Sequence, residues 1–544
     1  MKSPQRTTLG LDVSTQSISA VLLNVDSGES VWSRSIAYRE DARLLGYGFE
    51  HDTMIMPARE PGEAEQPPRL FVAALEALLD DLSAAGHDTR SITAINTSGQ
   101  QHGHVYLNDK AESVFRSLHD NEFPPVSLAL RFRGVFAYGG APIWKTANTA
   151  DEAEHIRACA GGKAAVIART GSDLPLRFSV MAHRKIAQRY PQAYASTCRI
   201  LQISSLIPAL LAGDCTIPLD FGNACGTGLM NYQDRRWDPT LLDAAAGDLP
   251  GGSEALAGKL SPIAHPLTTV GRIAPWFQRK YGFDSDCRII AGSGDNPQSM
   301  VLAEGNLLSL GTSFVYMIMT PLGDVDASGA ANAMYDALGR PFNLVCRSNG
   351  ALTWERLRIL HGLDAHDFSK SEDALATIPP GERMRFWQPD PESFPITGAN
   401  PELVRLDGKP PAFADDYAGV VDSSLGLVYR YGEKIATSEA GITPLSVCGG
   451  PSGSTEILHR VAAIWNRPVL RIGQAGAALG AAVAAAASNA WESDAHLAAA
   501  ADSLRSAIHA NATLVQPDPD RVRRYHGPGG FLDSMESAFE TLRA

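Results

Sequence analysis

The stretch TLGLDVSTQSISAVLLN, residues 8–24, consists of an apolar run, a short turn rich in serine and threonine, and a second apolar run. This pattern predicts a β-hairpin. The stretch NLLSLGTSFVYMIMT, residues 306–320, repeats the pattern around a Gly-Thr-Ser turn in the second half of the chain. Because one motif recurs in both halves, we expect two similarly built domains.

Helical patterns follow both hairpins. Apolar residues recur at three- and four-residue spacing over 70–85, and the stretches 455–465 and 473–487 also favour helices. The alternation of strands and helices predicts an α/β protein with partly parallel sheets. The stretch 271–286 precedes a new strand and is expected to connect the two halves, which gives the domains 1–280 and 281–544.

Composition narrows the class of protein. The 544 residues include 47 Lys and Arg against 60 Asp and Glu, a formal charge of −13, which argues against a nucleic-acid partner. Seven cysteines without a C-x-x-C pair indicate reduced thiols, and no secretion signal or apolar run of about 20 residues is present. We therefore expect a soluble, cytoplasmic protein that does not span a membrane.

Both hairpin turns could bind phosphate. Small residues in Asp12–Gln16 and Gly311–Ser313 allow backbone N–H groups and hydroxyls to converge on an anion. Asp12 ends the first strand, where a carboxylate could hold Mg²⁺ beside the phosphates. The alternative is that these residues merely form turns. Their duplication favours the phosphate interpretation.

Two further stretches carry candidate side chains. In AGSGDNPQSM, residues 291–300, Asp295 follows a glycine-rich strand end and could accept a proton from a substrate hydroxyl, or could only stabilise its own loop. NTSGQQHGH, residues 96–104, presents amides and imidazoles suited to a polyhydroxylated ligand. A single histidine in such a stretch can equally be structural.

A third glycine-rich stretch, VCGGPSGSTEI at residues 447–457, predicts a strand, a tight bend and a capped helix that could border a ring or a phosphate. The chain contains no G-x-x-x-x-G-K-[ST], HRD or DFG motif. The phosphate-binding loops of P-loop enzymes and protein kinases are therefore excluded.

Taken in order, these motifs resemble the FGGY family of carbohydrate kinases, and within it the xylulokinase branch. The resemblance extends over nearly the whole chain. It rests on LGLDVSTQSISAVLLN, TSGQQHG, APIW (141–144), TGS with RF (170–178), D-x-x-x-A-C-G-T-G (220–228), GSGDN, SLGTS and CGGPSGSTEIL. It implies two actin-like domains of the ribonuclease-H fold with a central cleft for ATP and sugar.

The resemblance also implies the roles of individual residues. Asp12 would assist Mg²⁺, and Asp295 would be the general base. The residues implied to hold the ketose are His102, Arg177, Asp295 and Asn296. Those implied to face ATP are Ser14, Thr15, Gly311, Thr312 and Ser313 at the phosphates, and Gly449, Gly450, Gly453 and Ser454 at the adenosine.

The chain departs from the family at two places. Trp144-Lys145-Thr146 lacks the carboxylate that many relatives carry there, and Ser454 stands where relatives often have Asn. The implied activity is ATP-dependent phosphorylation of a ketopentose, with D-xylulose favoured. Another ketose or polyol, or a non-transferring actin-fold ATPase or binding module, is the alternative. The expected partners are ATP and a small sugar. The sequence does not determine the oligomeric state, for which a homodimer is one alternative.

Overall fold

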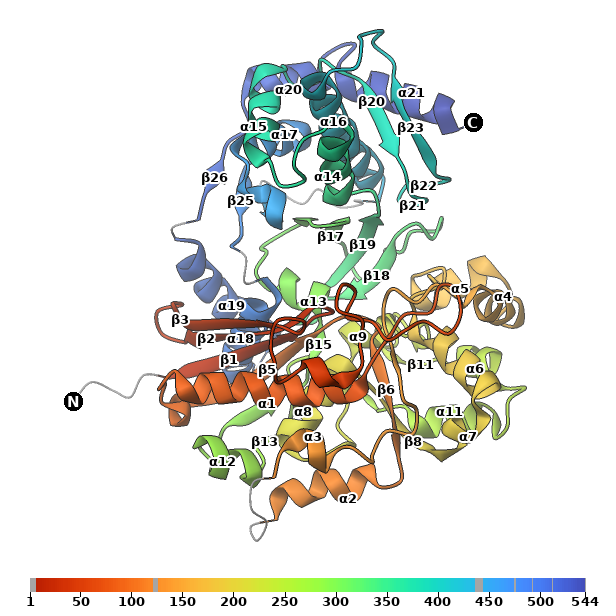
Figure 1. Cartoon of the computed structure of the whole chain (residues 1–544), viewed down its shortest axis with the longest axis vertical. Helices are drawn as coiled ribbons and strands as arrows, with labels where there is room; N and C mark the ends of the chain where they lie inside the picture. Colours follow the sequence, from red (N-terminus) through yellow and green to blue (C-terminus); the bar gives the residue numbers. More distant parts are fainter. Residues whose placement is uncertain are drawn as a thin grey trace, which may run out of the picture. The chain divides into compact units, whose positions relative to one another are not determined.

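The computed structural model describes residues 6–120, 126–435, 444–473, 476–491, 493–510 and 512–543. The chain forms two compact units (Figure 1). The first unit comprises Met1–Leu302, Ala333–Arg340 and Ala475–Ile508, and the second comprises Ala303–Asn332, Pro341–Gln474 and His509–Ala544.

The predicted N-terminal hairpin is confirmed. Strands β1 (Thr7–Val13) and β2 (Ser17–Asn24) pair antiparallel, and β1 also pairs parallel to β5 (Ile92–Gly99). The sheet has the order β13-β14-β5-β1-β2-β3. Its other strands are β3 (Ser30–Ala37), β13 (Thr269–Arg272), β14 (Arg288–Ile290) and β15 (Ser293–Gly294), the last of which pairs with β5.

Three strands of this sheet end side by side. Both β1 and β15 run parallel to β5, and the register places Asp12 of β1 and Ser293 of β15 opposite Ser98 of β5. Helix α13 (Asp295–Met300) begins directly after β15. Because the carboxyl ends of parallel strands meet at one edge, Asp12 and Asp295 are brought to the same edge of the sheet.

The alanine-rich helix α18 (Gly476–Ala487) packs directly on β1, β2 and β5. The approach is so close that a Cβ on Gly10 would lie 2.0 Å from the carbonyl oxygen of Ala478. A helix was predicted over 473–487 in a domain 281–544, and α18 confirms it from Gly476 onward, while residues 474 and 475 lie outside the described residues. By its contacts, α18 belongs to the first unit, as do residues 281–302.

Gly480 of α18 provides a test of this packing. A Cβ there would lie 1.9 Å from the carbonyl oxygen of Gln298 in α13, so Gly480→Ala should force the two helices apart. We expect a loss of about 1–3 kcal/mol in the free energy of unfolding, measured as a lower melting temperature. Gly258→Ala is the matched control, because Gly258 lies in helix α11 (Gly252–Lys259) with open space around it. An unchanged melting temperature for Gly480→Ala would contradict the close packing.

Helices complete the first unit. The predicted helix over 70–85 is α1 (Pro68–Ala84), which packs on β2 and β3 and buries its leucines in the main core. A second hydrophobic core includes Tyr106 and Ile200 of the antiparallel strands β6 (His104–Asn108) and β8 (Thr197–Gln202). The helices around it are α4 (Ala150–Cys159), α5 (Lys163–Thr170), α6 (Ser179–Arg189), α10 (Pro239–Ala246) and α11.

The second unit contains the second hairpin. Strands β16 (Leu307–Leu310) and β17 (Phe314–Met319) pair antiparallel around the Gly311–Ser313 turn, as predicted. Neighbouring strands give the order β19-β17-β16-β24-β25-β26, with β19 at Pro341–Arg347, β24 at Leu445–Cys448, β25 at Val469–Arg471 and β26 at Leu514–Val515.

The helices of the second unit pack around a hydrophobic core. They are α14 (Ala351–Leu360), α15 (Phe368–Thr377), α16 (Phe413–Glu433), α17 (Thr455–Trp465), α20 (Pro519–His526) and α21 (Phe531–Arg543). The predicted helix over 455–465 coincides with α17. No helix in the described ranges is long and apolar enough to cross a membrane.

Candidate active site

Asp12 lies near the end of β1 and is held by two hydroxyl groups. Ser98 donates a hydrogen bond to its Oδ1 atom over 2.6 Å, and Ser14 donates to its Oδ2 atom. Burial raises the pKa of Asp12, and the two hydrogen bonds oppose that rise. The carboxylate therefore has a fixed orientation and lies where a cation would relieve its desolvation.

Asp295 is the first residue of α13, and its carboxylate lies close enough to Asp12 for the two charges to interact. Burial raises the pKa of Asp295 to about 7, and the negative charge of Asp12 adds to the rise. The backbone N–H of Asn296 donates to Asp295 Oδ1 over 2.9 Å. The Asn296 amide in turn donates to Gln101 Oε1 over 2.8 Å. The structure thus brings the predicted pair Asp295 and Asn296 together with Asp12.

His102 follows β5 in the left-handed region, with φ of 68°, and is buried. Its Nδ1 donates to the carbonyl oxygen of Gly226 over 2.9 Å, and its ring stacks on Phe178 at 5.0 Å between centroids. Burial, followed by the charge of Arg177, lowers the pKa of His102 to about 3. His102 is therefore a neutral imidazole beside Arg177, held by the chain's own backbone.

Thr15 is tied into a chain of side-chain hydrogen bonds. Trp144 Nε1 donates to Thr15 Oγ1 over 2.9 Å, and Thr15 donates to Gln100 Oε1 over 3.0 Å. Gln100 Nε2 donates to Gln66 Oε1 over 2.7 Å, and Gln66 Nε2 returns to the Thr15 carbonyl over 2.8 Å. Trp144, two residues before the position at which the expected carboxylate is missing, thus holds the side chain of Thr15 in the first predicted phosphate turn.

Sequence reasoning left Asp220 without a role. Its carboxylate accepts a hydrogen bond from Ser293 over 2.7 Å and caps α9 (Phe221–Cys225) through the N–H of Asn223. Burial raises the pKa of Asp220 to about 7. Because Ser293 belongs to the GSGDN stretch, Asp220 supports the backbone that presents Asp295. Its place in the motif D-x-x-x-A-C-G-T-G was the available signal.

The second unit has a pocket of about 760 Å³ beside the second predicted phosphate turn. Its walls come from the β16–β17 turn and from α14, α15, α16 and α17. Of the predicted residues, those that line it are Gly311, Thr312, Gly450, Gly453 and Ser454. Trp354, Phe368, Leu375 and Tyr417 supply a largely apolar wall. The volume and the mixed lining are typical of small-molecule sites.

The remaining predicted residues support this pocket without lining it. Gly449 has φ of 95°, and a Cβ there would lie 2.2 Å from the Leu310 carbonyl oxygen, so the bend requires glycine. Ser313 Oγ donates to the Ser348 carbonyl oxygen over 3.4 Å.

Ser454 has a structural task as well as a place in the pocket lining. Its hydroxyl caps α17 by accepting from the N–H of Ile457 over 3.1 Å, and donates to the Glu372 carboxylate. Glu372, which sequence analysis did not single out, also accepts from the N–H of Glu456 over 3.0 Å. It lies on α15, and no local pattern distinguishes it from other surface carboxylates of a helix.

Comparison with known proteins supports the motif assignment. The model of the N-terminal domain of the FGGY family of carbohydrate kinases matches residues 139–301. This part of the chain is therefore similar to the N-terminal domain of that family, and the resemblance inferred from the motifs is confirmed.

Individual relatives extend the match. A protein named probable D-xylulose kinase A from Arthroderma otae is 27% identical over 520 residues, 87% of each chain. One of the same name from Aspergillus flavus is 30% identical over 355 residues, which cover 64% of this chain and 60% of the relative's length. The xylulose kinase structure from Rhodospirillum rubrum superposes with a TM-score of 0.77 at 18% identity over 99% of both chains. The predicted actin-like α/β fold is thereby confirmed.

Proposed function

We propose that this chain is an ATP-dependent carbohydrate kinase that phosphorylates a ketopentose, with D-xylulose converted to D-xylulose 5-phosphate as the favoured reaction. The observation that carries the proposal is the pairing of Asp295 with Asp12 at the carboxyl edge of one sheet, where burial and mutual repulsion raise the pKa of Asp295 to about 7. The names of the relatives support the choice of sugar.

Asp295 is assigned the role of general base. A carboxylate with a pKa near neutrality accepts a proton from an attacking hydroxyl at cellular pH. As the hydroxyl oxygen forms its bond to the γ-phosphorus of ATP, the O–H proton passes to Asp295 and ADP departs with the bridging electron pair. Asn296, whose amide is oriented by Gln101, positions the same end of the sugar.

Asp12 is assigned to the metal of the nucleotide. In the described part of the chain no cluster of three or more His, Cys, Asp or Glu side chains could hold an ion by itself. Mg²⁺ does not require one, because it is commonly bound by one or two carboxylates together with phosphates and water. The oriented Asp12 carboxylate, desolvated and beside a second carboxylate, fits that role. When bound, Mg²⁺ would neutralise charge on the ATP phosphates.

The pocket of the second unit is assigned to ATP. Its apolar wall suits a purine ring, and the bare backbone at Gly450 and Gly453 allows the ligand to approach closely. Thr312 would face the phosphates. The predicted division into a sugar-binding domain, 1–280, and an ATP-binding domain, 281–544, remains part of this proposal, as does a cytoplasmic location.

The acceptor is tested by measuring ADP release in a coupled assay with D-xylulose, D-ribulose, pentitols and glycerol. We expect the highest kcat/KM with D-xylulose. A higher value for another acceptor would retain the kinase and replace the sugar, whereas ATP hydrolysis that no acceptor stimulates would favour a non-transferring ATPase.

His102 and Arg177 are predicted to act on the sugar. Arg177 can donate hydrogen bonds to hydroxyls, whereas neutral His102, whose Nδ1–H is donated to Gly226, can accept one from a hydroxyl at Nε2. A site built on such groups loses affinity when one is removed. Replacing either by Ala should raise the KM for the sugar far more than the KM for ATP, measured by steady-state kinetics. Equal changes in both constants, with a lower melting temperature, would indicate a structural role.

Gly450→Val tests the proposed nucleotide pocket, and it should affect the KM for ATP rather than the KM for the sugar. A Cβ at Gly450 meets no atom within 4 Å, so the valine side chain would stand in the pocket without disturbing the packing. We expect a higher KM for ATP with the KM for the sugar and the melting temperature almost unchanged. A normal KM for ATP would exclude this pocket as the nucleotide site.

A further inference from the structure

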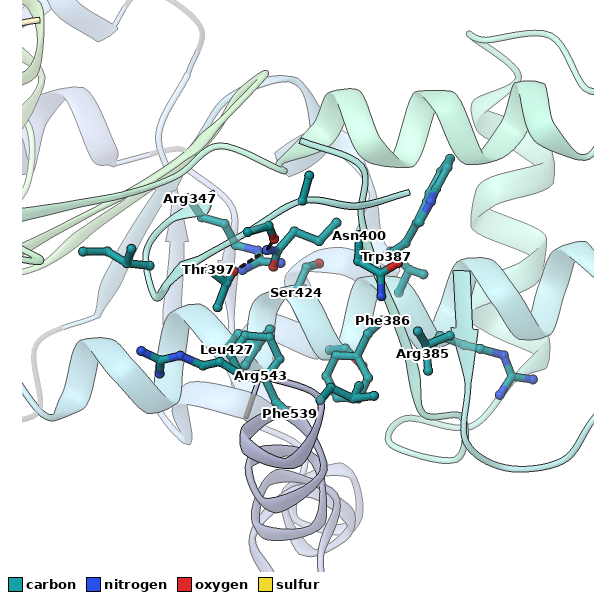
Figure 2. Close-up of a pocket in the computed structure, with 18 residues that line it drawn as sticks. Arg347, Arg385, Phe386, Trp387, Thr397, Asn400, Ser424, Leu427, Phe539 and Arg543 are labelled. Carbon is teal, nitrogen blue, oxygen red and sulfur yellow. Dashed lines mark hydrogen bonds between the residues drawn. The ribbon is translucent and has the colours of Figure 1, made fainter. Parts of the chain in front are cut away.

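The second unit contains another pocket, of about 470 Å³, that shares no lining residue with the proposed nucleotide site (Figure 2). It lies between α16, α21 and the proline-rich stretch 388–416. This stretch forms the short strands β21 (Glu392–Ser393), β22 (Ile396–Thr397) and β23 (Asn400–Arg405), the last paired with β20 (Arg385–Gln388).

Arg347, the last residue of β19, is the buried cation of this pocket. Its side chain is only 3% exposed, and burial lowers the pKa of its guanidinium, which retains its charge at neutral pH. Its Nε and Nη1 atoms find no hydrogen-bond partner in the described parts of the chain. A buried charged N–H group without a hydrogen-bond acceptor lowers the stability of the fold. A ligand that accepts a hydrogen bond from it therefore gains affinity.

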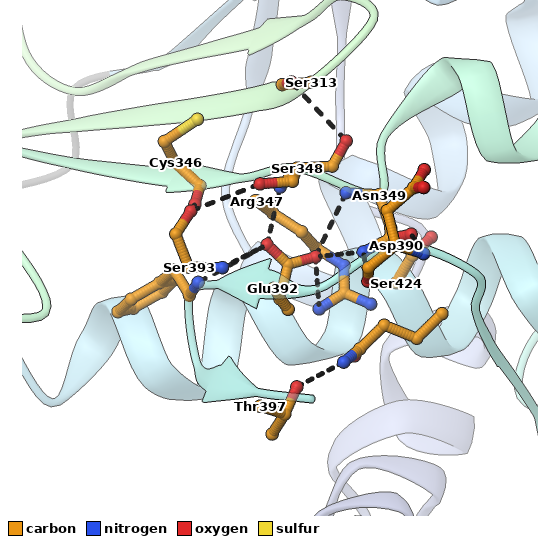
Figure 3. Close-up of polar contacts among 12 residues, drawn as sticks. Ser313, Cys346, Arg347, Ser348, Asn349, Asp390, Glu392, Ser393, Thr397 and Ser424 are labelled. Carbon is orange, nitrogen blue, oxygen red and sulfur yellow. Dashed lines mark hydrogen bonds and ion pairs between the residues drawn. The ribbon is translucent and has the colours of Figure 1, made fainter. Parts of the chain in front are cut away.

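The carboxylate of Glu392 forms an ion pair with Arg347, with 3.6 Å between Glu392 Oε2 and Arg347 Nη1. This distance is too long for a hydrogen bond, so the ion pair balances the charge of Arg347 without satisfying its N–H groups. The oxygens of Glu392 accept hydrogen bonds from other donors of the chain, as Figure 3 shows. It accepts from the N–H groups of Ser348, Asn349 and Ser393 over 2.5, 3.1 and 2.9 Å and from the Asn349 amide over 2.9 Å.

Other groups extend the polar end of the pocket. Gln388 Oε1 and Ser423 Oγ are also buried, and no partner for them is found within the described ranges. The Gln388 amide is fixed by donating to Thr397 and, over 2.8 Å, to the Gly398 carbonyl oxygen. In Figure 2 the Arg347 side chain reaches toward Thr397, whereas the Arg385 guanidinium points away.

The opposite end of the pocket is apolar. Phe386, Leu427 and Phe539 line it, and Arg543 lies at its edge (Figure 2). We propose that this pocket is a binding site for a small organic anion, in which a carboxylate or phosphate group pairs with Arg347 while an apolar body packs on these aromatic and aliphatic side chains. Arginine is suited to this task because its planar donors match the oxygens of both groups.

The site lies next to the proposed nucleotide pocket on helix α16. Ser424 lines the anion pocket, and its hydroxyl accepts a hydrogen bond over 3.2 Å from Nε1 of Trp354, which lines the nucleotide pocket. The anion site is nevertheless distinct, and it does not depend on the proposed function.

Calorimetric titration of the full chain with benzoate and with phenyl phosphate tests the proposal, with benzyl alcohol as the neutral probe. We expect one of the two anions to bind at a 1:1 ratio and at least about 10-fold more tightly than benzyl alcohol, since a hydrogen bond to a charged group is worth about 1.5–3 kcal/mol. The stronger anion identifies the ligand as a carboxylate or a phosphate. Equal affinity for the neutral probe, or no binding of either anion, would overturn the proposal.

Variants locate the binding. Arg347→Gln should weaken the anion by at least about 10-fold. Because Arg347 is buried, its replacement can also affect folding.

Ile396→Trp therefore provides a second test. Ile396 lines the pocket and is 56% exposed, so a larger ring should obstruct the pocket without entering the core. Arg356→Gln is the matched control, since Arg356 pairs with Asp390 outside the pocket. Anion binding that survives both Arg347→Gln and Ile396→Trp, or that is lost only in Gly450→Val, would overturn the assignment.

Discussion

Asp295→Asn is expected to lower kcat by at least about 100-fold while sugar binding changes little, because general-base catalysis typically contributes about 10²–10⁴-fold. An asparagine retains an oxygen that can accept the hydrogen bond from the N–H of Asn296 but cannot take the proton of the attacking hydroxyl. The measurement is steady-state turnover together with calorimetric binding of D-xylulose. Near-normal turnover would exclude Asp295 as the base.

The control for this variant is Asp220→Asn. Burial raises the pKa of both carboxylates to about 7, but the charge of Asp12 acts on Asp295, whereas Asp220 accepts a hydrogen bond from Ser293 and caps a helix. We expect Asp220→Asn to lower the melting temperature while its kcat stays close to that of the wild type. A loss of turnover as large as that of Asp295→Asn, at an unchanged melting temperature, would reverse the two roles.

The pKa of Asp295 also predicts a pH dependence. The base must be ionised, so kcat/KM should rise with pH through about 7, and Asp295→Asn should remove this step.

The free energy of unfolding should instead decrease as pH rises. The folded pKa of about 7 lies above the unfolded value near 3.9, so the stabilising contribution is complete below about pH 3.9 and is lost as pH rises through about 7. Asp295→Asn should therefore raise the melting temperature at pH 8 relative to wild type, and not at pH 3.5.

Asp12→Ala is expected to lower phosphoryl transfer by at least about 100-fold, because a metal ion supplies several kcal/mol of transition-state stabilisation and each 1.4 kcal/mol is a factor of about 10. The substitution also leaves the hydroxyls of Ser14 and Ser98 without their acceptor. The assay is ADP release over a range of Mg²⁺ concentrations. A variant with normal activity and normal Mg²⁺ dependence would contradict the assignment.

Asp12→Asn separates charge from hydrogen bonding in this site. The amide oxygen still accepts from one hydroxyl, whereas the negative charge that would attract Mg²⁺ is gone. We expect Asp12→Asn to lose nearly as much activity as Asp12→Ala while unfolding at a higher temperature than Asp12→Ala. If Asp12→Asn were fully active, the role of Asp12 would be to orient Ser14 and Ser98 rather than to hold a metal.

Local sequence patterns were sufficient to predict the strands and helices that carry the site. The hairpins around Asp12 and Gly311 were predicted because alternating apolar residues and small turn residues specify a strand pair over a short distance. Helices α1 and α17 were predicted from their spacing. The placement of Asp295 after a strand followed from the glycines before it. The roles of these residues came from the resemblance, which orders the motifs along the chain.

The amino-acid sequence by itself therefore determined the strand-turn-strand motifs, the α/β class and the candidates Asp12 and Asp295, because each depends on neighbours a few residues away. Only the tertiary structure decided that α18 packs on β1, that Trp144 holds Thr15 and that Glu372 caps the bend at Ser454. It also decided that Nε and Nη1 of Arg347 lie in a pocket formed by α16 and α21 with no hydrogen-bond partner among the described residues. These features join residues tens to hundreds of positions apart, and their energies arise from close packing and desolvation, which exist only after the elements have come together.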